Sequence, residues 1–353
     1  MENEISPAAW PLIHLAAACS EEAYNGVAVS SATPSAALER IKISQHCTSS
    51  QTRVTVVAVA GTRGLRDWIV NFKNGASEPV GVLVRSPVKG WIACADNRKG
   101  GQRNLCHSGF LKAVKMLISP LALPLSAVEK GSTLLFTGHS AGAAIASLLY
   151  AHLKSTNTSP LARCAAGFDI IHCIVFGAPP ISTTPLHDDE RSSHQGSLFL
   201  SLINDGDPII KADMGYIARK YRWLKPFRPH SLLMRQSRDK RAIESSSGVA
   251  AKPGSRLFAN SGTLLSMRIE SATAPKISIR ITDNQELDED RVTTWRVHGM
   301  KIYRKRIATL LAAGELIDYG CTDEKACSGH TTSRGNAHVE EVMLNGWIGL
   351  LLL

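Results

Sequence analysis

The pentapeptide Gly138-His139-Ser140-Ala141-Gly142 has the residue types and spacing of a nucleophilic serine site. It follows an apolar run, Leu134 to Thr137, and precedes an Ala-rich stretch without proline, Ala143 to Tyr150, that is typical of a helix. A serine on a strained turn between strand and helix, flanked by glycines, is the nucleophile-elbow pattern G-x-S-x-G. Glycine is needed at both flanks because side chains there would collide with neighbouring backbone. The pattern predicts that Ser140 is a catalytic nucleophile, and the alternative is a chance Gly-rich turn.

The same turn predicts part of an anion-binding site. Ala141 follows the serine at the start of the expected helix, where backbone N–H groups have no partner within the helix. Such an N–H can bind the oxyanion that forms when a serine attacks an ester or amide carbonyl. We therefore expect the N–H of Ala141 to be one of two oxyanion donors.

The elements that must position this turn alternate between strand-like and helix-like stretches. The strand-like runs cover 53–60, 134–137, 170–176, 198–203, 264–269 and 277–281, and the helix-like stretches cover 13–24, 111–118, 143–150 and part of 292–311. Alternation of this kind predicts an α/β fold with a doubly wound, mostly parallel sheet, and a site formed by the loops at the carboxyl ends of the strands. We expect one domain over residues 1–320, with a mobile Arg-, Lys-, Ser- and Gly-rich loop at 230–256. Residues 321–353 form a tail to which the sequence assigns no structure.

The composition and the first residues indicate the cellular compartment of the protein. Of the 353 residues, 44% are hydrophobic, which is ample for a core, but no stretch reaches the roughly 18 apolar residues of a membrane span. The first residues, MENEIS, are acidic rather than basic and do not resemble a signal peptide. Eight cysteines are scattered without a zinc-binding spacing. Together these features predict reduced thiols in an intracellular protein, either cytoplasmic or peripherally bound to a membrane. One or two disulfides in a protein exported by an unconventional route are the alternative.

The net charge of +10 is compatible with two kinds of anionic partner, nucleic acid or an anionic lipid surface. Twelve of the basic residues form three late clusters: Lys220, Arg222, Lys225 and Arg228; Arg235, Arg238, Lys240 and Arg241; and Lys301, Arg304, Lys305 and Arg306. No nucleic-acid-binding motif accompanies them, so no nucleic acid is expected as a partner. A membrane or lipid-droplet surface is the predicted peripheral contact, and ordinary solvated charge is the alternative.

Four blocks together resemble the class 3 lipase family, the α/β-hydrolases related to fungal triacylglycerol lipases. They are GTRGLRDWIVNF at 61–72, HSGF at 107–110, the elbow GHSAGAAIA at 138–146 and VFGAPPIS at 175–182. The match covers roughly residues 10–215, and a block from His298 to Tyr303 extends it. Pro180 stands where the family usually has arginine. The resemblance implies an α/β-hydrolase fold and an acylglycerol-lipase type of activity on lipid esters.

The acid of the triad is predicted to be Asp207. In α/β-hydrolases the triad follows the chain order Ser, Asp, His, with the carboxylate after a strand. The run 198–203 delivers Asp205 and Asp207, and Asp207 begins a D-P-I sequence similar to the family's D-P-[VI] signature. Asp205 precedes a glycine and is better suited to a turn, and Asp213 is a weaker alternative.

The base is predicted to be His298, with His230 as the main alternative. Four histidines follow Asp207: His230, His298, His330 and His338. His298 lies in WRVHGMKIY, which resembles the family's H-x-x-Y segment, although the tyrosine here is five positions on. His139, next to the nucleophile, is expected to pack beneath the turn, because adjacent side chains at a sharp elbow point apart.

The resemblance assigns two further residues. Thr62, after the glycine that ends an early strand, is the second oxyanion donor, and Trp68 lies in a segment similar to the family's lid. The alternative for Thr62 is an ordinary turn residue, and the alternative for Trp68 is a side chain that packs in the core. No metal or cofactor motif is visible, and none is expected because the chemistry needs neither.

The sequence thus predicts a serine acylhydrolase of the lipase type. Ser140, His298 and Asp207 form its triad, and a lipid ester is its substrate. The competing interpretations are a catalytically silent, lipase-like protein that binds a partner or a lipid, and a basic nucleic-acid-associated protein supported by charge alone.

Overall fold

The computed structural model describes eleven stretches of the chain, which hold the sheet and its covering helices. They are residues 5–25, 38–48, 52–62, 75–83, 104–128, 133–155, 158–187, 196–212, 256–270, 277–287 and 293–313. Several predictions lie outside these residues: the lid residue Trp68, the alternative triad members Asp213, His230, His330 and His338, the loop 230–256 apart from its last residue, and the tail 321–353.

Seven strands form one sheet in the order β1-β2-β5-β6-β7-β8-β9. Their bounds are β1 Ile41–Cys47, β2 Arg53–Val59, β5 Thr133–His139, β6 Ile170–Phe176, β7 Phe199–Asn204, β8 Thr263–Ile269 and β9 Ile277–Thr282. The five strands from β2 to β8 run parallel to one another, and the edge strands β1 and β9 pair antiparallel. The predicted mostly parallel α/β sheet is confirmed. A second sheet joins β3 (Ala76–Ser77) to β4 (Cys106–His107).

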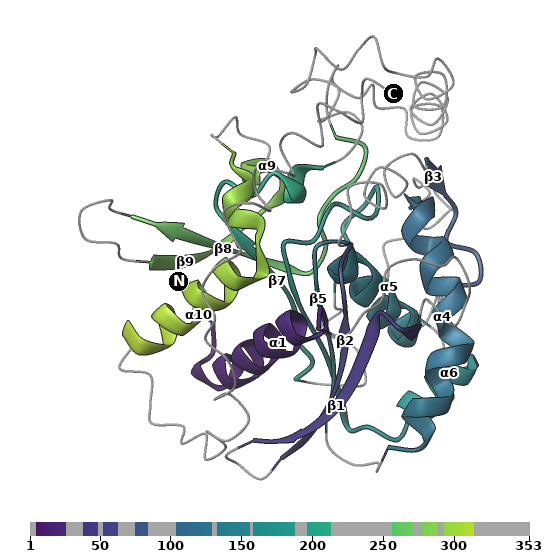
Figure 1. Cartoon of the computed structure of the whole chain (residues 1–353). Coiled ribbons are helices and arrows are strands. Elements are labelled where there is room, and N and C mark those ends of the chain that lie inside the picture. Colours follow the sequence, from purple (N-terminus) through teal and green to yellow (C-terminus); the bar gives the residue numbers. More distant parts are fainter. Residues whose placement is uncertain are drawn as a thin grey trace.

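Helices cover both faces of the large sheet (Figure 1). The longer ones are α1 Trp10–Glu22, α4 Ser108–Ser126, α5 Ala141–Ser155, α6 Pro160–Ala165 and α10 Met300–Ala313. Helices α4, α5 and α6 pack together on one face, and α1 and α10 lie side by side on the other. Each face has its own hydrophobic core, because apolar side chains of a central strand alternate between the two sides of the sheet. The fold thus brings α10, late in the chain, next to α1.

The remaining elements are short. They are η1 Pro7–Ala9, η3 Ile209–Lys211, α9 Asn284–Leu287 and η5 Trp295–His298. Elements η3 and η5 matter for the site because each adjoins a residue of the predicted triad.

Helix α4 differs most from its prediction. The sequence predicts a helix over 111–118, whereas α4 spans Ser108–Ser126 and includes Pro120 and Pro124. Its 19 residues, with an 18-residue window of mean hydropathy 1.3, are long and apolar enough to cross a membrane by length and composition alone, contrary to the expectation from the sequence. Because α4 packs against α5 and α6 and buries side chains such as Phe110 and Leu121, it serves as a core helix in this fold.

Candidate active site

Ser140 stands on a sharp turn between β5 and α5. Its φ angle is +59°, in the left-handed region, and among the described residues it is the one residue other than glycine with a positive φ. Its N–H donates a 3.0 Å hydrogen bond to the carbonyl oxygen of Phe176 on β6. The serine thus adopts the strained backbone that the elbow pattern predicts.

The two flanking glycines let the elbow pack closely against β2. A Cβ on Gly138 would lie 2.7 Å from the backbone of Gly142 and 2.8 Å from the carbonyl oxygen of Val59. A Cβ on Gly142 would clash with the backbone of Val59 and Ala60. Any larger residue at either position would force β2, β5 and α5 apart, which accounts for both glycines.

His298 lies beside the serine. It is the last residue of η5, and α10 begins two residues later. Its Nε2 is 3.0 Å from Ser140 Oγ, and its Nδ1 is 2.8 Å from Asp207 Oδ2. In the neutral ring, Nδ1–H donates to the carboxylate and Nε2 accepts from the serine hydroxyl, which is the arrangement of a general base for Ser140. The structure thus brings all three predicted triad residues together.

Asp207 is fully buried and is held by three hydrogen bonds. It follows β7, and its carboxylate accepts from His298 Nδ1, from the hydroxyl of Tyr303 at 2.7 Å and from the N–H of Ile209 at 2.8 Å. Burial alone would raise its pKa, but the nearby His298 charge and these three hydrogen bonds lower the pKa below its usual value. The carboxylate therefore stays ionised and can stabilise a protonated His298.

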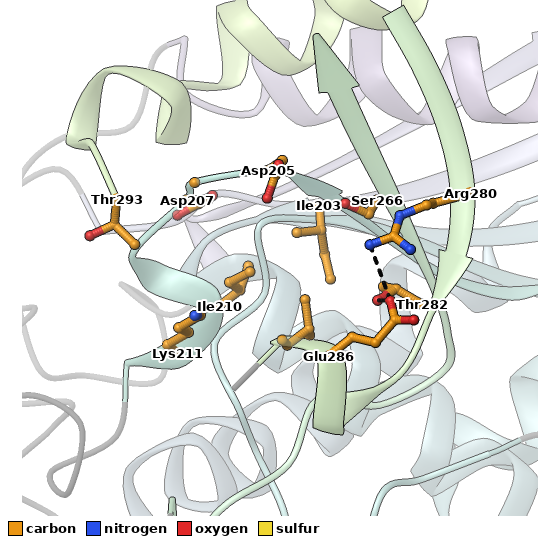
Figure 2. Close-up of a pocket in the computed structure, with 12 residues that line it drawn as sticks. Ile203, Asp205, Asp207, Ile210, Lys211, Ser266, Arg280, Thr282, Glu286 and Thr293 are labelled. Carbon is orange, nitrogen blue, oxygen red and sulfur yellow. Dashed lines mark hydrogen bonds and ion pairs between the residues drawn. The ribbon is translucent and has the colours of Figure 1, made fainter. Parts of the chain in front are cut away.

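The neighbouring carboxylate, Asp205, has other contacts. It lies in the turn after β7, and Oδ2 is 3.6 Å from Arg268 Nε on β8. Figure 2 shows Asp205 and Asp207 at the rim of a hollow between β7, β8, β9 and α9, where Arg280 and Glu286 form a 3.2 Å ion pair. Asp205 thus pairs with Arg268 on β8 rather than with the histidine.

Tyr303 is a member of the site that the sequence analysis did not assign. It lies on α10, is fully buried, and accepts a 3.0 Å hydrogen bond from the N–H of Asn204 while donating to Asp207. Burial, and then the charge of Asp207, raise its pKa well above its usual value, so the phenol stays protonated as a donor. The block from His298 to Tyr303 contains the sequence signal for this tyrosine, but in the sequence analysis it served only to identify the histidine.

Gly177, after β6, makes room for this group of residues. Its φ is +54°, and a Cβ there would lie 2.9 Å from Asp207 Oδ2, 3.0 Å from the Tyr303 hydroxyl and 3.2 Å from His298 Nδ1. No side chain fits between these three polar groups. The glycine of the VFGAPPIS block is therefore fixed by the site as well as by the turn.

The two predicted oxyanion donors come from the start of α5 and from the segment that follows β2. Ala141 opens α5, so its N–H is one of the first-turn donors that lack a helical partner. Thr62 follows Gly61, at which a Cβ would lie 3.3 Å from Ser140 Cβ. Thr62 Oγ1 is buried and has no hydrogen-bond partner within the described part of the chain. An orphaned buried hydroxyl beside a nucleophile is available to a developing oxyanion.

His139 lies behind the triad rather than in it. It contacts His298 ring to ring, with centroids 4.5 Å apart, and its own nitrogens bond to Tyr24 and to the backbone at position 298. Burial, and then the charge of His298, lower its pKa from 6.5 to about 3. Because both of its nitrogens bond to groups other than Ser140 Oγ, His139 is not placed to serve as the base.

The basic cluster on α10 is less available to a lipid surface than the sequence suggested. Arg306 is buried and donates to Asn204 Oδ1 at 3.0 Å, and Arg304 pairs with Glu21 of α1 at 2.8 Å. Lys301 and Lys305 are exposed. The other two basic clusters lie outside the described residues. Among the residues that the structure does describe, no three His, Cys, Asp or Glu side chains gather as metal ligands.

Solved structures similar to the chain include three fungal lipases. They are a triacylglycerol lipase from Penicillium expansum (14% identity, 82% of this chain and 91% of that chain, TM-score 0.42), the triacylglyceride lipase of Rhizomucor miehei (14%, 84% and 94%, 0.41) and a lipase from Rhizopus microsporus var. chinensis (13%, 84% and 88%, 0.40). Comparison with curated protein sequences gives no match.

A family model identifies the segment that carries the site. The model, described as Lipase (class 3), matches residues 56–214. This segment contains Thr62, Ser140 and Asp207, and His298 follows it. The match to the class 3 lipase model over residues 56–214 supports the resemblance that the sequence blocks predicted.

Proposed function

We propose that this protein is a serine acylhydrolase that cleaves carboxylic esters of lipids. The observation that carries the proposal is the continuous line of contacts from Ser140 Oγ to His298 Nε2 at 3.0 Å and from His298 Nδ1 to Asp207 Oδ2 at 2.8 Å. This line starts at an elbow serine in a class 3 lipase segment. Both contacts are within the reach that nucleophile, base and orienting acid require.

The geometry supports a two-step reaction. Ser140 Oγ attacks the ester carbonyl carbon while His298 Nε2 takes the hydroxyl proton, and Asp207 stabilises the resulting imidazolium. The N–H of Ala141, together with Thr62, donates to the tetrahedral oxyanion. When the C–O bond of the ester breaks, His298 returns the proton to the leaving alkoxide and an acyl-enzyme remains. Water then attacks this intermediate, His298 takes the water's proton, and the fatty acid leaves as Ser140 is regenerated.

Contact with a lipid surface is part of the proposal. Its support among the described residues is the exposed pair Lys301 and Lys305, one turn apart on α10, each of which would add about 1 kcal/mol near an anionic surface. Sedimentation of inactive Ser140→Ala protein with anionic and neutral liposomes at low salt measures this binding without turnover. A Lys301→Ala/Lys305→Ala double substitution should weaken sedimentation with anionic liposomes. Equal, weak binding to both liposome types would remove the surface role.

The experiment that tests the enzymatic proposal combines a probe with a substrate panel. A fluorophosphonate should label wild-type protein and leave Ser140→Ala unlabelled, because only an activated serine reacts. Tri-, di- and monoacylglycerols and a phospholipid, offered to the wild-type protein, would then identify the preferred ester. An unlabelled, inactive wild-type protein would instead indicate a catalytically silent member of the fold that binds a lipid or a partner.

A further inference from the structure

His139 connects the N-terminal helix to the backbone of His298. Its Nδ1 is 2.8 Å from the hydroxyl of Tyr24, which lies two residues after α1, and its Nε2 is 2.6 Å from the carbonyl oxygen of His298. Along the sequence, Tyr24 is 115 residues before His139, and His298 is 159 residues after it. A histidine whose two nitrogens are both engaged in this way has a defined orientation.

The direction of these hydrogen bonds follows from the chemistry of the groups. A backbone carbonyl only accepts, so Nε2 of His139 must carry the proton and donate it to position 298. In a neutral imidazole the other nitrogen then has a lone pair, and Nδ1 must accept from the Tyr24 hydroxyl. The His139 carbonyl oxygen lies further from that hydroxyl, at 3.5 Å. The carbonyl of His298 therefore fixes the tautomer of His139, and the Tyr24 hydroxyl donates to the nitrogen that this tautomer leaves unprotonated. The pKa of His139, about 3 because of its burial, keeps the ring neutral.

The loop that carries His298 is held from two sides. On one side the amide of Asn204, at the end of β7, donates to the carbonyl of Val297 at 2.7 Å. On the other side His139, at the end of β5, donates to the carbonyl of His298 itself. Both hydrogen bonds are accepted by backbone carbonyls and neither involves the His298 side chain, so both hold the backbone of the loop. The imidazole contacts of 3.0 Å and 2.8 Å to Ser140 and Asp207 then depend on where that backbone stands.

We infer that His139 and Tyr24 are positioning residues, which act through the backbone carbonyl of His298 to hold its imidazole in line with Ser140. The inference rests on the proposed hydrolase function, since it concerns the base of that reaction. It assigns a role to the residue before the nucleophile and to Tyr24, two residues after α1.

Two substitutions at position 139 separate this role from packing. His139→Gln keeps an N–H donor near the Nε2 position, whereas His139→Leu has similar bulk and no donor. We expect His139→Leu to lower kcat for a short p-nitrophenyl ester on the order of tenfold or more with little change in KM, because a small misplacement of a catalytic group has effects of this size. His139→Gln should recover most of the loss. If the ring served only to fill space, His139→Leu would retain wild-type kcat, and that result would overturn the inference.

Tyr24→Phe keeps the test valid should His139→Leu not fold. It removes only a hydroxyl and leaves Nδ1 of His139 without its donor, so that the ring is no longer held from the side of Tyr24. We expect kcat to fall and KM to hold. In ¹⁵N-histidine NMR spectra, the His139 Nδ1 signal should shift because it loses this hydrogen bond. A wild-type kcat in Tyr24→Phe would contradict the inference.

Ser20→Ala is the matched control. Ser20 also joins α1 to β5, through a 2.8 Å hydrogen bond between its hydroxyl and that of Thr137, and within the described part of the chain its side chain has no hydrogen bond to position 298. It should lower stability and leave kcat unchanged. If Ser20→Ala lowers kcat as Tyr24→Phe does, a general loosening of α1 explains both and the inference fails. Inactivity of the wild-type protein would overturn the proposed function instead, so the two failures are distinguishable.

Discussion

Tyr303 and His298 donate to the same oxygen of Asp207, Oδ2, at 2.7 Å and 2.8 Å. The tyrosine comes from the second turn of α10 and the histidine from η5 just before that helix, so one segment supplies both partners of the acid. The tyrosine hydroxyl also accepts a hydrogen bond from the Asn204 N–H, so it is an acceptor and a donor at the same time. Tyr303 thus ties the carboxylate to the end of β7 and to α10 at once.

Tyr303→Phe should lower both activity and stability. The substitution leaves the buried Asn204 N–H without its acceptor, at a cost of about 1–3 kcal/mol in the free energy of unfolding. It also removes a hydrogen bond that lowers the pKa of Asp207, so that pKa should rise. Urea unfolding and kcat measured on one p-nitrophenyl ester test both effects. Unchanged values of both would show that the hydroxyl contributes nothing to the site.

Gly177→Ala should impair catalysis more than folding. The new methyl would lie 2.9 Å from Asp207 Oδ2, between the acid and its two donors. We expect kcat to fall by about tenfold or more, because the carboxylate must shift. Gly81→Ala is the control: its φ is +77°, with nothing within 4 Å of the added Cβ, so it has similar backbone strain, about 1 kcal/mol, without the collision. Equal kcat values for the two variants would argue against the steric role of Gly177.

Stability should fall as the pH drops from 7 to 5. Burial lowers the pKa of His139 from 6.5 to about 3 and that of His107 from 6.5 to about 4. Between these values the unfolded chain binds protons that the folded chain does not, so each lowered pKa reduces stability as pH falls through 6.5. The loss approaches about 2 kcal/mol per histidine at pH 5.

Chemical unfolding at pH 7, 6 and 5 measures this dependence, and His139→Gln should remove part of the slope. A free energy of unfolding that stays constant over this range would mean that neither histidine is held neutral by burial.

The parts of the site that the sequence located are those with local signals. The elbow, its flanking glycines and the D-P-I turn after β7 are each readable within a few residues, because strand–turn–helix geometry restricts which residues fit. His298 is harder to identify from the sequence, because 158 residues separate it from Ser140 along the chain and two strands come before it. The structure brings it to the serine, whereas His230 lies outside the described residues.

The contacts that the sequence did not locate depend on packing between distant elements. Tyr24 meets His139 only because α1 packs against β5, and Tyr303 reaches Asp207 only because α10 packs beside α1. The same packing buries Arg306, although the sequence groups it with basic residues that were expected to lie on the surface. The edge strand β1 was also not predicted, because IKISQHC mixes polar and apolar residues and its stabilisation comes from pairing with β2.

The central claim is that Ser140, His298 and Asp207 act as one catalytic unit. The most direct measurement compares kcat/KM of Ser140→Ala, His298→Ala and the double substitution with that of the wild type, on a short p-nitrophenyl ester. Because members of a triad act together, each single substitution should abolish most of the activity, and the double substitution should be no worse than either. Retention of more than about a tenth of wild-type activity by a clean preparation of Ser140→Ala, or additive losses in the double variant, would contradict the claim.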